Sequence, residues 1–233
     1  MKPNAAVADL LEYLQDLGFV DLRTAPDRGR AAAPATPEGA GVATEQVDSG
    51  SALAALAAEA ATCERCALSQ GRNRVVFGSG PENARILFVG EGPGAEEDRQ
   101  GVPFVGAAGE LLTKILGAIG LEREAVYIAN IVKCRPPGNR DPAPEEVAAC
   151  RGFLERQIAL VRPRLIVALG RVAAQSLLGS GEPLGRLRGS WHDLDGIPLR
   201  VTYHPAALLR NAGYKRPTWE DMQLIRDRLH ELP

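Results

Sequence analysis

Short apolar runs alternate with longer amphipathic segments from about residue 51 to the C-terminus. Four apolar runs predict buried strands at 84–91, 124–132, 164–170 and 197–205. Apolar residues at helical spacing predict helices around them, at 51–61, 106–120, 144–161, 171–179 and 216–232. Because strands that alternate with such helices usually pair in parallel, we expect an α/β fold with helices on both faces of the sheet.

The N-terminal part of the chain follows a different pattern. Apolar residues recur at helical spacing within 5–20, which predicts a short amphipathic helix in residues 1–23. Residues 24–50 are rich in Ala, Pro, Gly and Thr without periodicity, which is typical of a disordered linker. We therefore expect one folded domain over 51–233. The helix either packs on that domain or binds a replication or repair partner.

Length and composition indicate a soluble protein with a full hydrophobic core. The chain has 233 residues, of which 45% are hydrophobic. No apolar run is long enough to cross a membrane, and the first eight residues lack the apolar segment of a secretory signal. We expect a cytoplasmic monomer.

Charge is distributed unevenly along the chain. Residues 1–60 carry four basic and nine acidic side chains, a net charge of −5, which leaves +3 for the rest. Arginine outnumbers lysine 23 to 4, which indicates either phosphate binding or only a GC-rich genome. Residues 200–216 hold four basic side chains and no acidic one, so this stretch is a candidate nucleic-acid contact.

The four cysteines of the chain are the strongest chemical signal. Cys63 and Cys66 form a C-x₂-C pair, and Cys134 and Cys150 follow far along the chain. In a cytoplasmic protein such cysteines are more often metal ligands than disulfides. Four thiolates suit zinc or an iron–sulfur cluster, and the spacing alone does not choose between them.

Unusual residues gather where the predicted strands end. The first strand runs into the glycine-rich loop GEGPGAEEDRQGVPFVG at 90–106, the second ends near Asn130, and the last ends at His204 and Pro205. In parallel sheets the carboxyl ends of the strands form the binding crevice. Each feature also has a structural interpretation: a plain glycine-rich turn, a turn-capping asparagine and a structural histidine.

Taken together, GEGPGAEEDRQGVPFVG, NIVKCRPPGNRDP and HPAAL, in this order and with the four cysteines, resemble family 4 of the uracil-DNA glycosylases. The resemblance runs from about residue 60 to the C-terminus. It implies an α/β/α sandwich around a central four-stranded parallel sheet. It also implies a 4Fe–4S cluster held by the four cysteines, Cys63, Cys66, Cys134 and Cys150, and an enzyme that excises uracil from DNA.

The resemblance also implies a role for each residue of a uracil pocket. Phe104 would stack on the flipped base, and Asn130 would accept from uracil N3–H and donate to O4. Glu97 and the backbone of Gly92 would exclude the 5-methyl group of thymine. His204 would stabilise the uracil anion.

The activation of water departs from the superfamily pattern. The best-known members carry an aspartate at the position of Gly92, and no carboxylate stands there in this chain. Glu91 is the candidate by adjacency, and a dissociative route with a backbone-held water is the alternative. The segment after Cys134 contains no histidine that would trap the sugar, so we expect no stable covalent adduct with DNA.

The substrate is expected to be uracil-containing DNA, single- or double-stranded. Leu208 or Leu209 would fill the space that the flipped nucleotide leaves, and Arg210 and Lys215 would contact phosphates. Two other classes remain open from sequence: a non-catalytic nucleic-acid-binding module, which would need neither Asn130 nor His204, and an electron-transfer protein, which would be expected to have more compact cysteine spacing.

Overall fold

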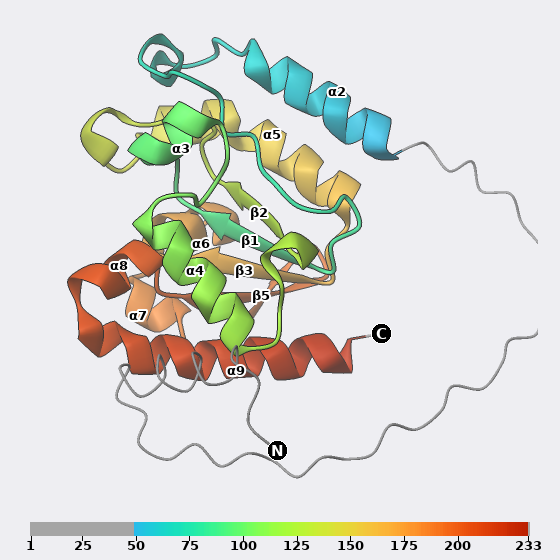
Figure 1. The fold of residues 1–233 in the computed structure, drawn as a ribbon, viewed down its shortest axis with the longest axis vertical. Coiled ribbons are helices and arrows are strands. Elements are labelled where there is room, and N and C mark those ends of the chain that lie inside the picture. The colour runs from blue at the N-terminus through green and yellow to red at the C-terminus, as the bar shows by residue number, and fades with distance from the viewer. Residues whose placement is uncertain (1–48, 233) are drawn as a thin grey trace, which may run out of the picture. The chain divides into compact units, whose positions relative to one another are not determined.

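The computed structural model describes residues 49–232, with side chains from residue 52. One sheet with the strand order β2-β1-β3-β5-β4 forms its centre (Figure 1). The strands are β1 (Ile86–Gly90), β2 (Tyr127–Asn130), β3 (Leu165–Leu169), β4 (Trp191–Leu194) and β5 (Ile197–Thr202). The first three and β5 pair in parallel, which confirms the α/β fold expected from the sequence.

The sheet has five strands where four were expected. The additional strand, β4, pairs antiparallel with β5 at the edge of the sheet. Asp195 and Gly196 connect the two strands, and both have positive φ angles, 52° and 86°. Two such residues form the tight turn that an Asp-Gly pair favours in hairpins, so the signal for this strand was present in the sequence.

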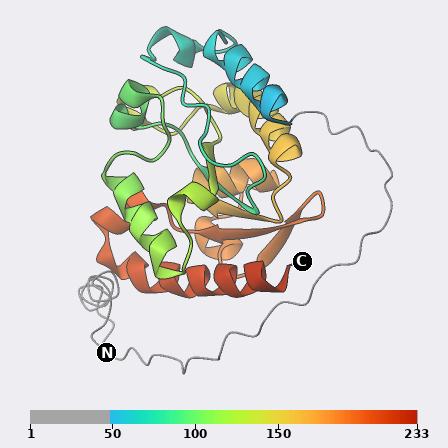
Figure 2. The same ribbon diagram turned by 45° about the vertical axis from the view of Figure 1, so that its right-hand side comes forward.

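Helices cover both faces of the sheet. On one face lie α2 (Ser49–Ala61), α5 (Pro144–Val161), α6 (Arg171–Leu178) and α7 (Leu184–Leu187). On the other lie α4 (Ala107–Ala118) and the long α9 (Lys215–Glu231), which Figure 2 shows along the sheet on the side away from α5. Two short helices, α3 (Ala95–Gln100) and α8 (Pro205–Arg210), follow the ends of β1 and β5.

The strands β1, β2 and β3 contribute alternate residues to two separate cores. On β1, Leu87 and Val89 pack with the α5 side, whereas Ile86 and Phe88 pack with the α4 and α9 side. All five residues of β1 are buried, as expected for a central parallel strand covered on both faces. The two cores fix the sheet rigidly, and its carboxyl edge carries the residues that follow β1, β2 and β5.

Two predictions fall on residues outside the described range. The amphipathic helix of residues 1–23 and nearly all of the linker predicted at 24–50 lie before residue 49, where α2 begins. Among the described helices, none has the length and apolar character needed to span a membrane.

Candidate functional site

A cavity of about 320 Å³ opens at the carboxyl ends of β1, β2 and β5. Its walls contain all six residues predicted for the uracil pocket, which are Glu91, Gly92, Glu97, Phe104, Asn130 and His204. Arg210 also lines the cavity. These residues come from segments as much as 113 positions apart in the chain, and the parallel sheet brings them to one edge.

Gly90 allows the two central side chains of the cavity to lie close together. It is the last residue of β1 and pairs in register with Asn130 of β2. A Cβ atom at Gly90 would lie 2.4 Å from Asn130 Oδ1 and 2.7 Å from Phe104 Cζ. Both distances are shorter than any normal contact, so only glycine fits. The sequence places Gly90 at the start of the glycine-rich loop but does not predict this role.

Asn130 carries an unused acceptor. Its side chain is 1% exposed, and its Oδ1 atom has no hydrogen-bond partner. Leaving a buried polar atom without a partner costs about 1–3 kcal/mol, so such atoms usually serve a ligand. The backbone at Asn130 is well anchored, since Lys133 Nζ donates to the Asn130 carbonyl at 2.8 Å and to Gln157 Oε1 at 2.6 Å.

Phe104 is held in an unusual backbone conformation. Its φ angle is 54°, which is rare for a bulky residue and is maintained only where the surroundings enforce it. Gly109 permits that conformation, because a Cβ atom there would lie 1.9 Å from the Phe104 carbonyl oxygen. The Phe104 ring lies 5.4 Å from the His204 ring, between centroids, at an angle of 31°. The ring of Phe104 therefore lies beside the ring of His204 in the cavity.

Glu97 organises the segment that carries Phe104. Its Oε2 atom accepts from the Gly94 N–H at 3.1 Å, and Oε1 accepts from the Val105 and Gly106 N–H groups, each at 2.9 Å. Because Gly106 directly precedes α4, this carboxylate joins the N-terminal ends of α3 and α4. The Glu97 carboxylate is therefore part of the structure of the loop rather than simply solvated.

His204 has a defined tautomer. Its Nδ1 atom accepts from the Ala206 N–H at 3.1 Å and so caps α8, which leaves the ring proton on Nε2. Burial and, after it, the charge of Arg210 lower the pKa of His204 to about 4, against an opposing effect of Glu97. The ring is therefore neutral near pH 7 and presents an N–H donor.

Glu91 is the second titratable group of the cavity. Burial and then the Asp141 carboxylate raise the pKa of Glu91 to about 7, while Arg171 and Arg210 oppose the shift. Asp141 also lies on the cavity wall and pairs with Arg171. A carboxyl group with a pKa near 7 suits proton transfer at neutral pH.

The motif NIVKCRPPGNRDP contains the segment that closes one side of the cavity, and the sequence predicted no role in the pocket for that segment. Pro136, Asn139, Arg140 and Asp141 line it, and Arg140 is fixed by two hydrogen bonds of 2.7 and 2.8 Å to Glu146 at the start of α5. The run of Pro, Gly, Asn and Asp between residues 136 and 142 was the available signal, since such turn residues follow directly on the second strand.

The four residues predicted to contact DNA differ in their exposure. Leu208 is only 4% exposed, whereas Leu209 is 55% exposed. A buried side chain cannot enter a duplex while α8 stays folded. Of the two leucines, only Leu209 therefore remains a candidate to fill the space that a flipped nucleotide leaves. Arg210 is exposed at the cavity rim, and Lys215 is half-buried at the first position of α9.

The four cysteines come together although they arise from distant segments. Cys63 and Cys66 follow α2, Cys134 follows β2, and Cys150 lies within α5. All four line one small cavity of about 10 Å³, together with Arg65, Arg72 and Lys133. Within residues 49–232, no three potential metal ligands stand close enough together to hold a single ion.

Positive groups and N–H donors surround the sulfur atoms. Arg72 Nη1 lies 3.5 Å from Cys134 Sγ, and the Lys133 backbone N–H donates to Cys150 Sγ at 3.3 Å. Burial raises the pKa of both the Cys134 and the Cys150 thiols, while Arg72 and Lys133 respectively act against it. The Arg72 guanidinium and the Lys133 backbone N–H therefore favour the thiolate form that a metal group needs, whereas burial opposes it.

Comparisons with known proteins agree with this geometry. The model of the uracil DNA glycosylase superfamily matches residues 77–223. The type-4 uracil-DNA glycosylase of Archaeoglobus fulgidus is 46% identical over 175 residues, which cover 72% of this chain and 88% of that protein. The type-4 enzyme of Thermotoga maritima is 48% identical over 165 residues, which cover 69% and 86%. This chain therefore belongs to the uracil-DNA glycosylase superfamily, among the type-4 uracil-DNA glycosylases.

Proposed function

We propose that the cavity receives a uracil base flipped out of DNA and that the enzyme hydrolyses its N-glycosidic bond, leaving an abasic site. The observation that carries this proposal is the unpartnered Asn130 Oδ1 atom, buried beside an aromatic ring and a neutral histidine. A planar base with one N–H on its edge satisfies that acceptor while it stacks on Phe104.

Asn130 selects uracil over cytosine by hydrogen-bond pattern. Its Oδ1 atom accepts from N3–H of uracil, and its Nδ2 group donates to O4. Cytosine presents an acceptor at N3 and a donor at N4, so both contacts would be mismatched, at a cost of about 1–3 kcal/mol for each group. Because Gly90 has no side chain, the amide of Asn130 can lie directly beside the end of β1.

Thymine is excluded by shape, because its hydrogen-bonding edge equals that of uracil. Gly92 and Glu97 form the wall for the 5-methyl group. Glu97 suits this role because its carboxylate is held by three backbone N–H groups and cannot swing away. Gly92 is also confined, since a Cβ atom there would lie 2.8 Å from Val132 Cγ2.

His204 stabilises the leaving group. When the glycosidic bond breaks, negative charge develops on uracil O2, and the Nε2–H of His204 donates to it. A prearranged donor of this kind in a dry site is worth about 2.7–4 kcal/mol in the transition state. The ring acts as a neutral donor, because a pKa of about 4 means that it carries a single ring proton, on Nε2, near pH 7.

Glu91 acts on the water that attacks the sugar. Its carboxylate accepts a proton from that water, and this requires the ionised form. Because the pKa of Glu91 is raised to about 7, the ionised fraction increases through neutral pH. Asp141 lies on the same wall and keeps that pKa high.

The pH dependence of excision tests the role of Glu91. We expect the single-turnover rate to rise between pH 6 and 8 and to level off above, with no second inflection from His204 in that range. Glu91→Gln is expected to lower the plateau by about 10²-fold and to remove the inflection. Glu110→Gln, at an exposed position of α4, serves as the control. A Gln variant that keeps the wild-type inflection would exclude Glu91 as the base.

Contacts at the rim of the cavity and beyond it bind the DNA strand. Leu209 fills the space that the flipped nucleotide leaves, while Arg210 and Lys215 neutralise phosphates. The enzyme acts as a monomer on single- or double-stranded DNA in the cytoplasm. Leu209 suits the wedge because it is among the few large apolar side chains exposed in the described part of the chain.

The cysteine site holds a 4Fe–4S cluster. Four thiolates from three separate segments, with Arg72 and a backbone N–H at the sulfur atoms, are a donor set that fits this group. Bound there, it supplies iron–thiolate bonds that tie together the ends of α2 and β2 and the middle of α5. The cysteines Cys63, Cys66, Cys134 and Cys150 are its ligands.

Anaerobically purified protein tests this assignment. We expect a brown solution with broad visible absorbance and about four iron atoms per chain. Cys150→Ser is expected to lose most of the colour and to unfold at a lower temperature than Ser69→Ala, a change at a nearby residue without a thiol. Colourless protein with stoichiometric zinc would refute the cluster.

The function itself is tested with oligonucleotides that carry a single uracil, in single strands and in U·A and U·G duplexes. Alkali cleavage at the resulting abasic site reports excision. Cleavage of all uracil substrates, and none of thymine or cytosine controls, is the expected result. Tight DNA binding without base release would favour a binding module instead.

A further inference from the structure

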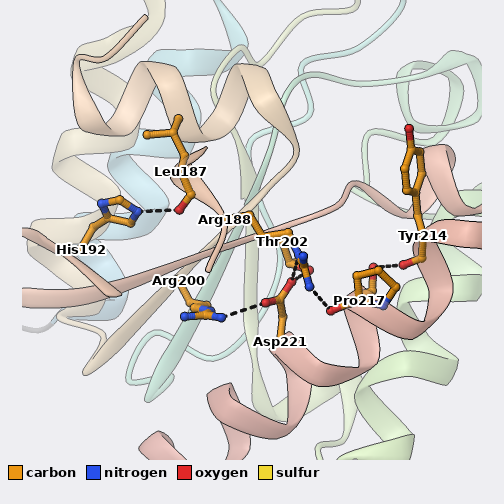
Figure 3. Close-up of polar contacts among 9 residues, drawn as sticks. Leu187, Arg188, His192, Arg200, Thr202, Tyr214, Pro217 and Asp221 are labelled. Carbon is orange, nitrogen blue, oxygen red and sulfur yellow. Dashed lines mark hydrogen bonds and ion pairs between the residues drawn. The ribbon is translucent and has the colours of Figure 1, made fainter. Parts of the chain in front are cut away.

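A buried carboxylate on α9 accepts hydrogen bonds from three side chains that lead to the His204 segment (Figure 3). Asp221 is 1% exposed. It accepts from Thr202 Oγ1 at 2.8 Å, Arg200 Nη2 at 2.9 Å and Arg188 Nε at 2.5 Å. Thr202 is the last residue of β5, so one end of the network stands two residues before His204.

Arg188 connects this network to the first turn of α9 and to Tyr203. Its Nη2 atom donates to the carbonyl of Pro217, in the first turn of α9. Its guanidinium also lies 5.1 Å from the centre of the Tyr203 ring. Tyr203 in turn stacks on Tyr214, with ring centroids 4.3 Å apart and an angle of 12°. Arg188 therefore contacts Tyr203, the first residue of the segment 203–214, which we term the histidine loop, and Pro217, three residues beyond its last residue.

The histidine loop contains the residues that must act together on a flipped nucleotide. His204, the second residue of the loop, lies on the cavity wall, and Leu209 and Arg210 follow on α8. Its first and last residues, Tyr203 and Tyr214, stack on each other. Because Asp221 holds Thr202 and Arg188 packs on Tyr203, the two residues directly before His204, a shift of either Arg188 or Asp221 would move His204 relative to the base.

Stability alone does not account for such a network. Removing two arginines and a carboxylate from water costs several kcal/mol per ion, and apolar replacements of similar size are often at least as stable. Here the charges lie behind a catalytic loop, where fixed position matters more than net stabilisation. A change at a distant residue that displaces a catalytic group by about 1 Å can lower the rate by about 10²-fold.

We propose that Arg188, acting through Asp221 and Tyr203, is a positioning residue that sets the place of His204 in the transition state. The inference rests on the proposed function. Arg188 touches neither the base nor the cavity, since it is absent from the cavity walls. Its effect on catalysis therefore passes through the histidine loop.

A double-mutant cycle with single-turnover kinetics tests this proposal. Arg188→Met keeps the length of the side chain and removes its hydrogen bonds. We expect it to slow excision by about tenfold or more in the wild-type background and less than about twofold in the His204→Ala background. Arg186→Met, at an exposed arginine of α7 that pairs with Glu182, is the matched control and should change neither rate.

Equal slowing in both backgrounds, or no slowing in the wild type, overturns the proposal, because a purely structural role does not depend on His204. If Arg188→Met does not fold, Tyr214→Leu carries the same test. It removes the ring stacking without unpairing a buried charge, and Tyr214→Phe is its control. Absence of uracil excision by the wild type would instead refute the proposed function.

Discussion

Asn130→Leu is expected to lower kcat/KM for uracil excision by about 10³-fold. The substitution preserves volume but removes both hydrogen bonds to the base. At about 1–3 kcal/mol each, their loss amounts to about 4 kcal/mol of transition-state stabilisation. Binding to DNA outside the cavity should change little, because Arg210 and Lys215 are untouched.

Kinetics on a U·G duplex at several enzyme concentrations measure this effect. Asn83→Leu is the matched control, since Asn83 is an exposed residue before β1, at the opposite end of the sheet. The control should excise uracil at the wild-type rate. A less than tenfold loss in Asn130→Leu, with the fold intact by circular dichroism, would remove Asn130 from base recognition.

Gly90→Ala is expected to reduce excision by about 10²-fold or more although it adds only one methyl group. That methyl would lie 2.4 Å from Asn130 Oδ1 and 2.7 Å from the Phe104 ring. At least one of the two must move, and either movement displaces a group that contacts the base. A misplacement of about 1 Å is sufficient for a loss of this size.

Single-turnover rates and thermal unfolding separate the two possible effects of this methyl group. Gly117→Ala in α4 is the control, because a Cβ atom there meets nothing within 4 Å. It should keep full activity and gain about 0.5–1 kcal/mol of stability. Wild-type activity in Gly90→Ala would show that Asn130 and Phe104 need not lie where the structure has them.

The sequence predicted the parts of the fold that depend on local pattern. The central strands β1 and β3 are continuous apolar runs, so their burial on both faces could be read directly. The edge strand β4 was missed because only its turn, Asp195-Gly196, gives a clear signal, while its residues alternate between exposed and half-buried. Such short edge strands carry little hydrophobic pattern.

The candidate site was predicted as a set of residues but not as an arrangement. Glu97 could be placed beside the base by resemblance, yet its three backbone partners lie three to nine residues away and depend on the path of the loop. Likewise Leu208 and Leu209 are equivalent in sequence, and only the packing of α8 separates them. The role of Gly90 could not be predicted from sequence, because it depends on where the side chains of Asn130 and Phe104 lie.

Inhibition by free bases tests most directly whether Asn130 Oδ1 accepts from uracil N3–H. Uracil is expected to inhibit excision, whereas 3-methyluracil, which lacks that N–H and adds bulk, should inhibit at least about tenfold more weakly. In Asn130→Leu the difference between the two should largely disappear. Equal inhibition of the wild type by both compounds would contradict the account.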